Sequence, residues 1–448
     1  MMRSYPRYWN EKMETMSPEE MRHVQEKKLL DQVAYCYEKS QFYREKFDSA
    51  GLKPKDIKKI EDLEKLPFTE KEELRISIDQ APPLGKHRAA SMEEIIRIHG
   101  SSGTTGRPSF IGLTRHDADV WNETCARCVW TLGYRPNYIV IHAWNYSIFV
   151  GGVSDHIGTE MIGATVIPMG VGNSARLVHL ADHFKVDAIN ATASYFSILA
   201  PIVRQELGKE PAELGIKKLA CGAEPGAGIP SIRKLLQETW NADAYNVTGL
   251  SDVFGWHGAE CEYKKGMHYA GSDFCLFELI DVNTQKVLEL ADGVEGEIVY
   301  TMIDRQASPL LRFRSHDYAV VWTSKCDCGR TTLRFEIKGR NDDMLIVKGV
   351  NVFPTAIEDV LKRFVPEITG EFQILLDHPS PLTKIKMRVE YGHGFDVARL
   401  AELKKRIEDR MREMLLFKAE VDLVPPLTMP RVEYKPKRLY KLYEGEKP

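Results

Sequence analysis

A loop of small hydroxyl and glycine residues is the first stretch of this chain that could do chemistry. Residues 101–108 read Ser-Ser-Gly-Thr-Thr-Gly-Arg-Pro and follow an apolar run, residues 95–99, that predicts a short strand. Glycines let backbone N–H groups approach an anion, and the hydroxyls add further donors. The spacing and the lysine of a Walker loop are absent. The loop therefore predicts an anion-binding site, with an ordinary surface turn as the alternative.

Other polar and charged side chains stand at the ends of predicted strands or in polar loops. They occur in residues 221–225, 248–252, 312–318, 339–354 and 435–438. Ligands of open α/β sheets bind where strands end and loops begin. The first two of these segments each follow a predicted strand and are therefore candidate ligand contacts.

Cysteine and histidine residues form a second candidate site. Cys326 and Cys328 lie in a Cys-x-Cys-Gly turn, and Cys261 and His268 lie upstream of it. Three thiolates and one imidazole suit a closed structural Zn²⁺ site, which would tie a β-rich segment to the sheet domain. The alternative is separate, reduced, buried cysteines, because Cys-x-Cys is less diagnostic than paired Cys-x-x-Cys motifs. Cys275 is a possible substitute ligand.

Patterns of apolar residues predict the elements that position these groups. From about residue 95 to 255, short apolar runs alternate with longer amphipathic ones, which predicts an α/β domain with mostly parallel strands flanked by helices. Alternating runs at about 266–338 predict a β-rich subdomain, and the remaining C-terminal part reads as α+β. We therefore predict an N-terminal domain, residues 1–341, and a small C-terminal domain, residues 342–448, joined by a polar linker.

Length, charge and composition exclude several classes of protein. The 448 residues exceed one ordinary domain, and a net charge of -3 argues against nucleic-acid and membrane-surface partners. The start of the chain lacks the apolar core of a signal peptide, and no run is long enough for a membrane span. We therefore expect a cytoplasmic protein. Eight cysteines in a chain of this length do not make a disulfide scaffold.

In this order and spacing, the segments resemble the adenylate-forming superfamily of acyl-CoA synthetases, and most of all its phenylacetate-CoA ligase group. The resemblance runs from about residue 30 to the C-terminus, is closest in residues 101–108 and 339–354, and includes residues 162–169. It implies that a small carboxylic acid attacks the α-phosphate of ATP, giving an acyl-adenylate and pyrophosphate. The thiolate of coenzyme A then displaces AMP. Mg²⁺ is the implied cofactor, and a homodimer is one assembly that the resemblance allows.

The resemblance implies a role for each matching residue. Lys435 would bridge the carboxylate and the α-phosphate, with Lys437 as the alternative lysine. Asp252 would be catalytic through Mg²⁺, at a position where the family usually has glutamate; its alternative role is a helix N-cap. Asp342 matches the hinge about which the C-terminal domain rotates between the two half-reactions. The implied ATP and AMP contacts are Ser101, Ser102, Gly103, Thr104, Thr105, Gly106, Gly222, Ala223, Glu224, Pro225, Asn246, Thr248, Asp317 and Arg340.

Two of these assignments carry their own alternatives. Thr248 stands where the family often has an aromatic residue that stacks on adenine, so Tyr245, Asn246 or another neighbour is expected to pack there instead. Asp317 and Arg340 could also form a surface ion pair.

The acid is expected to contact the stretch that follows the strand predicted near residue 138. In the resembled group, residues 142–152 line the acyl pocket, and here they include Trp144 and Tyr146. These bulky side chains would shrink the pocket, and polar neighbours accompany them. The acid is thus either aryl, such as phenylacetate or benzoate, or a small carboxylic acid with or without a hydroxyl group. Trp256 and His257 are further candidate contacts, and core packing is the alternative for all four residues.

Three functions stay open at this point. The first is an AMP-forming acyl-CoA ligase. The second is an adenylyltransferase of the coenzyme F390 synthetase type, and the third is a non-catalytic nucleotide-binding relative.

Overall fold

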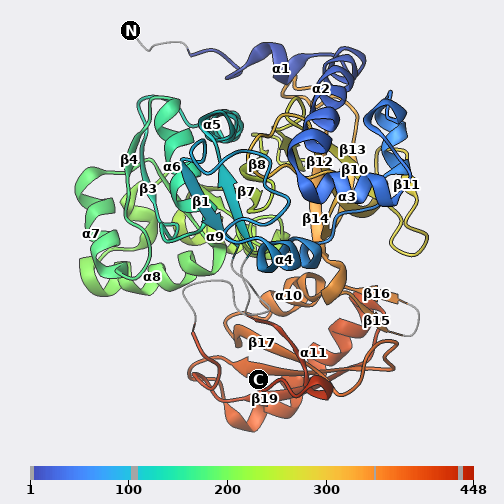
Figure 1. Ribbon diagram of the computed structural model, residues 1–448. Helices are drawn as coiled ribbons and strands as arrows, with labels where there is room; N and C mark the ends of the chain where they lie inside the picture. The colour runs from blue at the N-terminus through green and yellow to red at the C-terminus, as the bar shows by residue number, and fades with distance from the viewer. Residues whose placement is uncertain (1–4, 102–108, 348–349, 432–436) are drawn as a thin grey trace.

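The computed structural model describes the chain except residues 1–4, 102–108, 348–349 and 432–436 and the side chains at 342, 350 and 351 (Figure 1). A helical N-terminal region precedes the main sheet. Helix α2 begins with the capping box of Ser17 and Glu20, with proline at its first position. Apolar side chains of this region, including Val33 and Phe47, share a core with Ile303 of the β-rich part. The helices are α1 (Glu11–Thr15), α2 (Pro18–Lys39), α3 (Gln41–Ser49) and α4 (Lys71–Gln80).

A twelve-stranded sheet organises the centre of the molecule, in the order β11-β10-β12-β13-β14-β9-β8-β7-β6-β5-β3-β4. Neighbouring strands from β4 to β7 run parallel, and those from β7 to β11 run antiparallel. The parallel strands are β3 (Ile139–His142), β4 (Thr165–Ile167), β5 (Ala188–Ala191), β6 (Lys218–Cys221) and β7 (Asp243–Leu250). The others are β8 (Phe254–Glu260), β9 (Met267–Tyr269), β10 (Cys275–Ile280), β11 (Val287–Leu288), β12 (Glu295–Met302), β13 (Phe313–Trp322) and β14 (Arg334–Arg340).

Helices cover both faces of the parallel part. Ile141 and Ile189 share a core with α7 (Ser174–Phe184), α8 (Ala193–Leu207) and α9 (Pro230–Trp240). The residues beside them in sequence, Val140 and Ala188, pack instead with α5 (Arg115–Thr131). Successive strand residues point to opposite faces, which explains the near-continuous apolar runs of these strands. Helix α6 (Val150–Met161) packs beside α5.

The predicted fold class is confirmed, and the structure adds how the β-rich part is attached. Strands β9 to β14 continue the same sheet as the parallel strands, because β7 pairs antiparallel with β8 and β8 with β9. A separate two-stranded sheet, β1 (Arg97–Gly100) with β2 (Phe110–Leu113), flanks the loop at 102–108.

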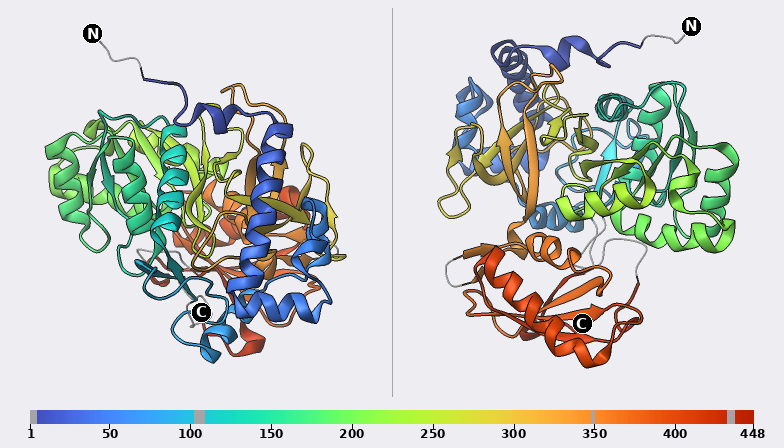
Figure 2. Two further views of the ribbon diagram at one scale, coloured as in Figure 1. Left: turned by 45° about the horizontal axis from the view of Figure 1, so that its top comes forward. Right: turned by 180° about the vertical axis from the view of Figure 1, so that it is seen from behind.

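The C-terminal part has a core of its own, formed by side chains from Leu345 to Leu439. It lies below the larger part in Figure 1 and in the right-hand view of Figure 2. A four-stranded sheet in the order β19-β18-β17-β20 is its centre. Its elements are β15 (Leu345–Val347), β16 (Val350–Val352), α10 (Pro354–Lys362), β17 (Ile368–Leu376), β18 (Ile385–Tyr391), α11 (Leu400–Leu415), β19 (Ala419–Val424) and β20 (Leu439–Lys441).

Within the described part of the chain, every helix is too short or too polar to span a bilayer.

Candidate active site

Asp252 lies in the turn between β7 and β8, and only 2% of it is exposed. Its Oδ1 accepts a hydrogen bond from the Ser109 hydroxyl at 2.8 Å, and Ser109 Oγ lies 3.0 Å from Ser101 Oγ. The carboxylate is thus tied to the residues on both sides of the loop at 102–108. A turn and a strand, rather than a helix, follow Asp252, so the N-cap alternative is wrong. The predicted loop contacts Ser102, Gly103, Thr104, Thr105 and Gly106 lie outside the described residues.

Lys71 is the counter-ion of this carboxylate, and the sequence reasoning missed it. Its Nζ lies 2.8 Å from Asp252 Oδ2, and the two residues are 181 positions apart. Lys71 occupies the first turn of α4, where the sequence shows only an ordinary helix start. No local pattern in the sequence could have identified this partner.

The residues just before Lys71 attach α4 to β13. Thr69 forms a parallel bridge with Phe313, and its N–H donates to the Arg312 carbonyl at 2.8 Å. Glu70 accepts from Arg314 at 3.0 Å and pairs with His316 Nε2 at 3.1 Å, which raises the pKa of His316. Residues 69–71 therefore connect the turn that carries Asp252 to the strand that carries Asp317.

The turn at residues 222–225 follows β6 at the carboxyl edge of the sheet. A Cβ at Gly222 would lie 2.9 Å from Val247 Cγ2, so this position requires glycine. Ala223 has a φ of +66°, and Pro225 is exposed. Glu224 Oε1 accepts the Ser194 N–H at 2.6 Å, and burial raises the pKa of its carboxyl group.

Asn246 and Thr248 lie on the adjacent strand, β7. The Asn246 N–H donates to Glu260 Oε2 at 2.7 Å, and Thr248 is partly exposed. Tyr245 is 3% exposed, accepts from Lys218 at 3.0 Å and has Lys264 Nζ over its ring. This arrangement commits Tyr245 to other contacts, which leaves Asn246 or another neighbouring residue as the expected replacement for the aromatic residue.

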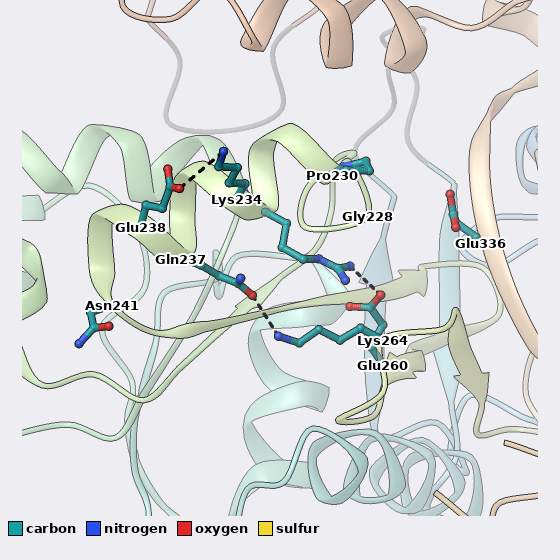
Figure 3. A pocket seen from close by; sticks show the side chains of 10 residues that line it. Gly228, Pro230, Lys234, Gln237, Glu238, Asn241, Glu260, Lys264 and Glu336 are labelled. Carbon is teal, nitrogen blue, oxygen red and sulfur yellow. Dashed lines mark hydrogen bonds and ion pairs between the residues drawn. The ribbon is translucent and has the colours of Figure 1, made fainter. Parts of the chain in front are cut away.

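A surface cavity of about 600 Å³ opens next to this edge (Figure 3). Two ion pairs join side chains that line it: Arg233 contacts Glu260 at 2.6 Å, and Lys234 lies 3.8 Å from Glu238. Asp252 and its partners Ser109 and Lys71 are not among the residues that line this cavity.

Asp317 and Arg340 face each other across the antiparallel strands β13 and β14. Arg340 Nη1 lies 3.8 Å from Asp317 Oδ1 and donates to the Ser315 carbonyl at 3.3 Å. The ion pair that was the alternative interpretation is present, although at this distance it is loose. Asp342 falls in the short 3₁₀ turn Asn341–Asp343 between β14 and β15, and its side chain is outside the described part of the chain.

The two candidate lysines differ in what the structure describes. Lys435 is outside the described residues. Lys437 is exposed and lies 2.7 Å from Glu446. Arg438 is largely buried and lies 2.6 Å from Glu371 on β17, which anchors the chain just after these lysines.

Among the side chains expected to contact the acid, Trp144 packs with Trp256, whereas Tyr146 contacts His156. Trp144 is 5% exposed and meets Trp256 edge to face at 6.5 Å. The backbone N–H of Trp256 donates to Asp155 Oδ1 on α6 at 2.9 Å. Burial raises the pKa of Asp155 to about 8. Tyr146 lies on the other side of the loop, where its hydroxyl is 2.8 Å from His156 Nδ1.

His257 lies on the opposite face of β8 from Trp256. It is enclosed by Phe335 and Tyr300, and its Nε2 is 3.1 Å from the Tyr300 hydroxyl. Burial lowers the pKa of His257 to about 4. This is a correction to the sequence prediction: Trp256 faces Trp144, whereas His257 belongs to the core of the β-rich part.

The predicted zinc ligands converge. The ligand atoms of Cys261, His268, Cys326 and Cys328 all lie within 4.8 Å of one another, and all four residues are buried. Cys328 Sγ is 3.3 Å from His268 Nε2, and the other ring nitrogen is 3.0 Å from the Thr332 hydroxyl, which orients the imidazole. This donor set fits Zn²⁺.

Cys275 lies outside this group, since its thiol contacts the Leu276 carbonyl within the core of the β-rich part. The expectation that it could substitute as a ligand is therefore wrong.

Comparison with known proteins agrees with this architecture. Residues 349–442 match the AMP-binding enzyme C-terminal domain family. The phenylacetate-coenzyme A ligase of Thermus thermophilus is 36% identical, covering 94% of this chain and 96% of that protein. The enzyme of the same name from Escherichia coli is 32% identical over 96% and 97% of the two chains.

The structure is also similar to solved structures of a CoA ligase over almost its whole length. A 2-hydroxyisobutyryl-CoA ligase in the postadenylation state, in complex with 2-HIB-AMP, superposes with a TM-score of 0.91 at 30% identity, covering 99% of this chain and 95% of that one. In the thioesterification state, with CoA as well, the TM-score is 0.73 at 31% identity over 98% and 94% of the chains. Fold and site define an adenylate-forming ligase. The chain belongs to the phenylacetate-CoA ligase family and is an AMP-forming acyl-CoA ligase.

Proposed function

We propose that this ligase activates an aryl acid or a small hydroxylated acid with ATP and transfers the acyl group to coenzyme A. The observation that carries the proposal is the position of Asp252, joined through Ser109 to the base of the loop at 102–108 and paired with Lys71. The names of the relatives support both acids, since one group acts on phenylacetate and the other on 2-hydroxyisobutyrate.

In the first half-reaction, the chain must hold three phosphates and a carboxylate close together. Loop donors at residues 101–106 would bind the β- and γ-phosphates. A carboxylate such as Asp252 suits Mg²⁺, which when bound spreads the charge that develops on the phosphate oxygens. Lys71 pairs with Asp252 and would turn to a phosphate when the nucleotide binds.

The nucleoside would lie along the carboxyl edge of the sheet. Glu224 follows β6, and Asn246 stands where the parallel pairing of β6 with β7 ends, which is the edge at which open α/β sheets bind ligands. Asp317 would accept from the ribose hydroxyls, and Arg340 would reach the nucleotide from the next strand.

Lys435 would balance the negative charge where the carboxylate meets the α-phosphate. The exposed ion pair of Lys437 with Glu446 favours Lys435 for this role. Asp342 would then act as the hinge for the second half-reaction, and the different TM-scores of the related ligase in its two states are consistent with such a rotation.

We further propose a structural Zn²⁺ held by the four converged cysteine and histidine side chains. When bound, it would link β8 and β9 to the turn at residues 326–328. Because all four ligands come from protein, the site has no open position for a substrate.

Pyrophosphate release across a panel of acids, with and without coenzyme A, tests the proposal. We expect pyrophosphate with a subset of the acids and thioester only when coenzyme A is present. Pyrophosphate without thioester would favour an adenylyltransferase, and no pyrophosphate with any acid would leave only a nucleotide-binding protein.

A further inference from the structure

Helix α9 begins without a capping side chain of its own. The residue before it, Ile229, is apolar and cannot accept a hydrogen bond from the free N–H groups of the first turn. The acceptor comes from α10 of the C-terminal part: the Ser231 N–H donates to Asp359 Oδ1 at 3.3 Å. The Ser231 hydroxyl also donates to the Asp359 backbone carbonyl at 3.2 Å. The start of α9 is therefore capped by a residue 128 positions further along the chain.

The first turn of α9 is tied to the carboxyl edge of the sheet. A Cβ at Gly228 would lie 2.8 Å from Asn246 Nδ2, so the chain just before α9 packs closely against that side chain. Arg233 Nε donates to the Ala227 carbonyl at 2.5 Å, which holds the same segment from within the helix. The position of Ser231 is thus fixed relative to the edge at which we expect the nucleoside.

The other side of this contact is joined to the region of the candidate lysines. Glu358, the neighbour of Asp359 on α10, lies 3.9 Å from Arg438. Arg438 also pairs with Glu371 on β17 at 2.6 Å, and it lies three positions beyond Lys435 in the sequence. Helix α10 therefore connects the start of α9 to the anchor of the segment that carries the expected catalytic lysine.

The contact joins two parts of the chain whose arrangement differs between states of the related ligase. The TM-score is 0.91 for that ligase in the postadenylation state and 0.73 in the thioesterification state, at nearly equal identity and coverage. Helix α9 belongs to the large part and α10 to the small one. A hydrogen bond between them depends on how the two parts are arranged, so it contributes to the preference for one arrangement.

We propose that Ser231 and Asp359 are positioning residues that stabilise the arrangement used for the first half-reaction. Their contact caps α9 only while α10 is docked on it. Its free energy therefore favours the arrangement in which the acid and ATP react over the arrangement in which coenzyme A reacts. This inference rests on the proposed function and adds which residues bias the rotation. Both residues act through the placement of the C-terminal part and not by contact with a substrate.

The test measures the two half-reactions separately. The first is single-turnover pyrophosphate release from ATP without coenzyme A, with phenylacetate, benzoate or 2-hydroxyisobutyrate as the acid. The second is thioester formation from coenzyme A and the synthetic acyl-adenylate of the same acid. We expect Asp359→Ala to lower the first rate about fivefold, the factor for one lost helix cap, and to leave the second rate unchanged or higher.

Two conservative variants refine this expectation. Asp359→Asn keeps a side-chain oxygen that can cap the helix, so it should restore most of the first rate. Ser231→Ala keeps the backbone N–H and loses only the hydroxyl, so it should lower the first rate about twofold.

Arg363 provides the matched control, because it forms an ion pair with Asp359 at 2.7 Å within α10. Arg363→Met removes that pair and keeps the Ser231 contact, so both rates should stay within about twofold of wild type. An equal loss of both rates in Asp359→Ala, or two unchanged rates, would overturn the inference while leaving acid activation intact. No pyrophosphate from wild type with any of the three acids would overturn the proposed function, and this inference with it.

Discussion

Replacing Lys71 with methionine tests how the site holds Asp252. The lysine ammonium lies 2.8 Å from a carboxylate that is 2% exposed, whereas the Lys71 side chain itself is 29% exposed. Methionine keeps the aliphatic length and removes the charge, which among the described residues leaves the buried carboxylate with Ser109 as its hydrogen-bond partner. Orphaning a fully buried charge costs about 3–5 kcal/mol. Because water reaches this lysine, we expect a smaller loss of about 1–3 kcal/mol in the free energy of unfolding.

Urea unfolding and pyrophosphate release together measure the effect. We expect K71M to unfold at lower urea and to release pyrophosphate about tenfold to hundredfold more slowly, since a displaced carboxylate misplaces the metal and the phosphates. The double variant of Lys71→Met with Asp252→Asn should unfold closer to wild type than K71M does, because the unpaired charge is gone. ATP with Mg²⁺ should stabilise K71M more than wild type, because Asp252 then regains a cation.

A lysine with similar geometry at the surface serves as the control. Lys209 lies 2.8 Å from Asp182 and is 37% exposed, so Lys209→Met should change stability by less than about 1 kcal/mol and leave activity unchanged. If K71M has the unfolding midpoint and the pyrophosphate rate of wild type, Asp252 does not depend on Lys71, and the role assigned to this ion pair is wrong.

Three other features of the molecule can be tested in the same way. Lys435→Ala should abolish pyrophosphate release while Lys437→Ala retains it; the reverse result would reassign the catalytic lysine. Glu70 raises the pKa of His316, so their contact stabilises the fold below about pH 6.5 and this contribution is lost as the pH rises past the folded-state pKa. Urea unfolding should therefore show that Glu70→Gln costs more stability at pH 6 than at pH 8, and an equal cost at both would contradict this. Metal analysis of protein purified without chelator should find about one zinc per chain and much less in Cys328→Ser, whereas a metal-free wild type would exclude the site.

Local patterns predicted most of the secondary structure. The strand predicted near residue 138 corresponds to β3, and the short apolar runs noted between about residues 95 and 255 include β5 and β6, because buried parallel strands read as continuous apolar runs. The β-rich part was predicted as a subdomain of the N-terminal domain, and its continuity with the sheet of the parallel strands was not predicted. That continuity depends on the hydrogen bonds of β8 with β7 and β9, which composition does not reveal.

A candidate site residue could be selected from the sequence where it lies in the loop that directly follows a predicted strand. Glu224 and Asp252 could be selected from the sequence, because loops after strands meet at one edge of an α/β sheet. The sequence could not show whether Trp256 or His257 faces Trp144. Alternation places the two on opposite faces, but only packing decides which face meets α5 and which meets the β-rich core.

The sequence by itself determined the class of enzyme and the four cysteine and histidine residues that converge at the proposed zinc site. Tertiary structure alone decided that Lys71 is the partner of Asp252, that residues 69–71 join two motifs, and that Tyr146 is held by His156. The physical reason is that a loop's residue types are set locally, whereas an ion pair between positions 181 residues apart exists only once the sheet and the N-terminal helices have packed.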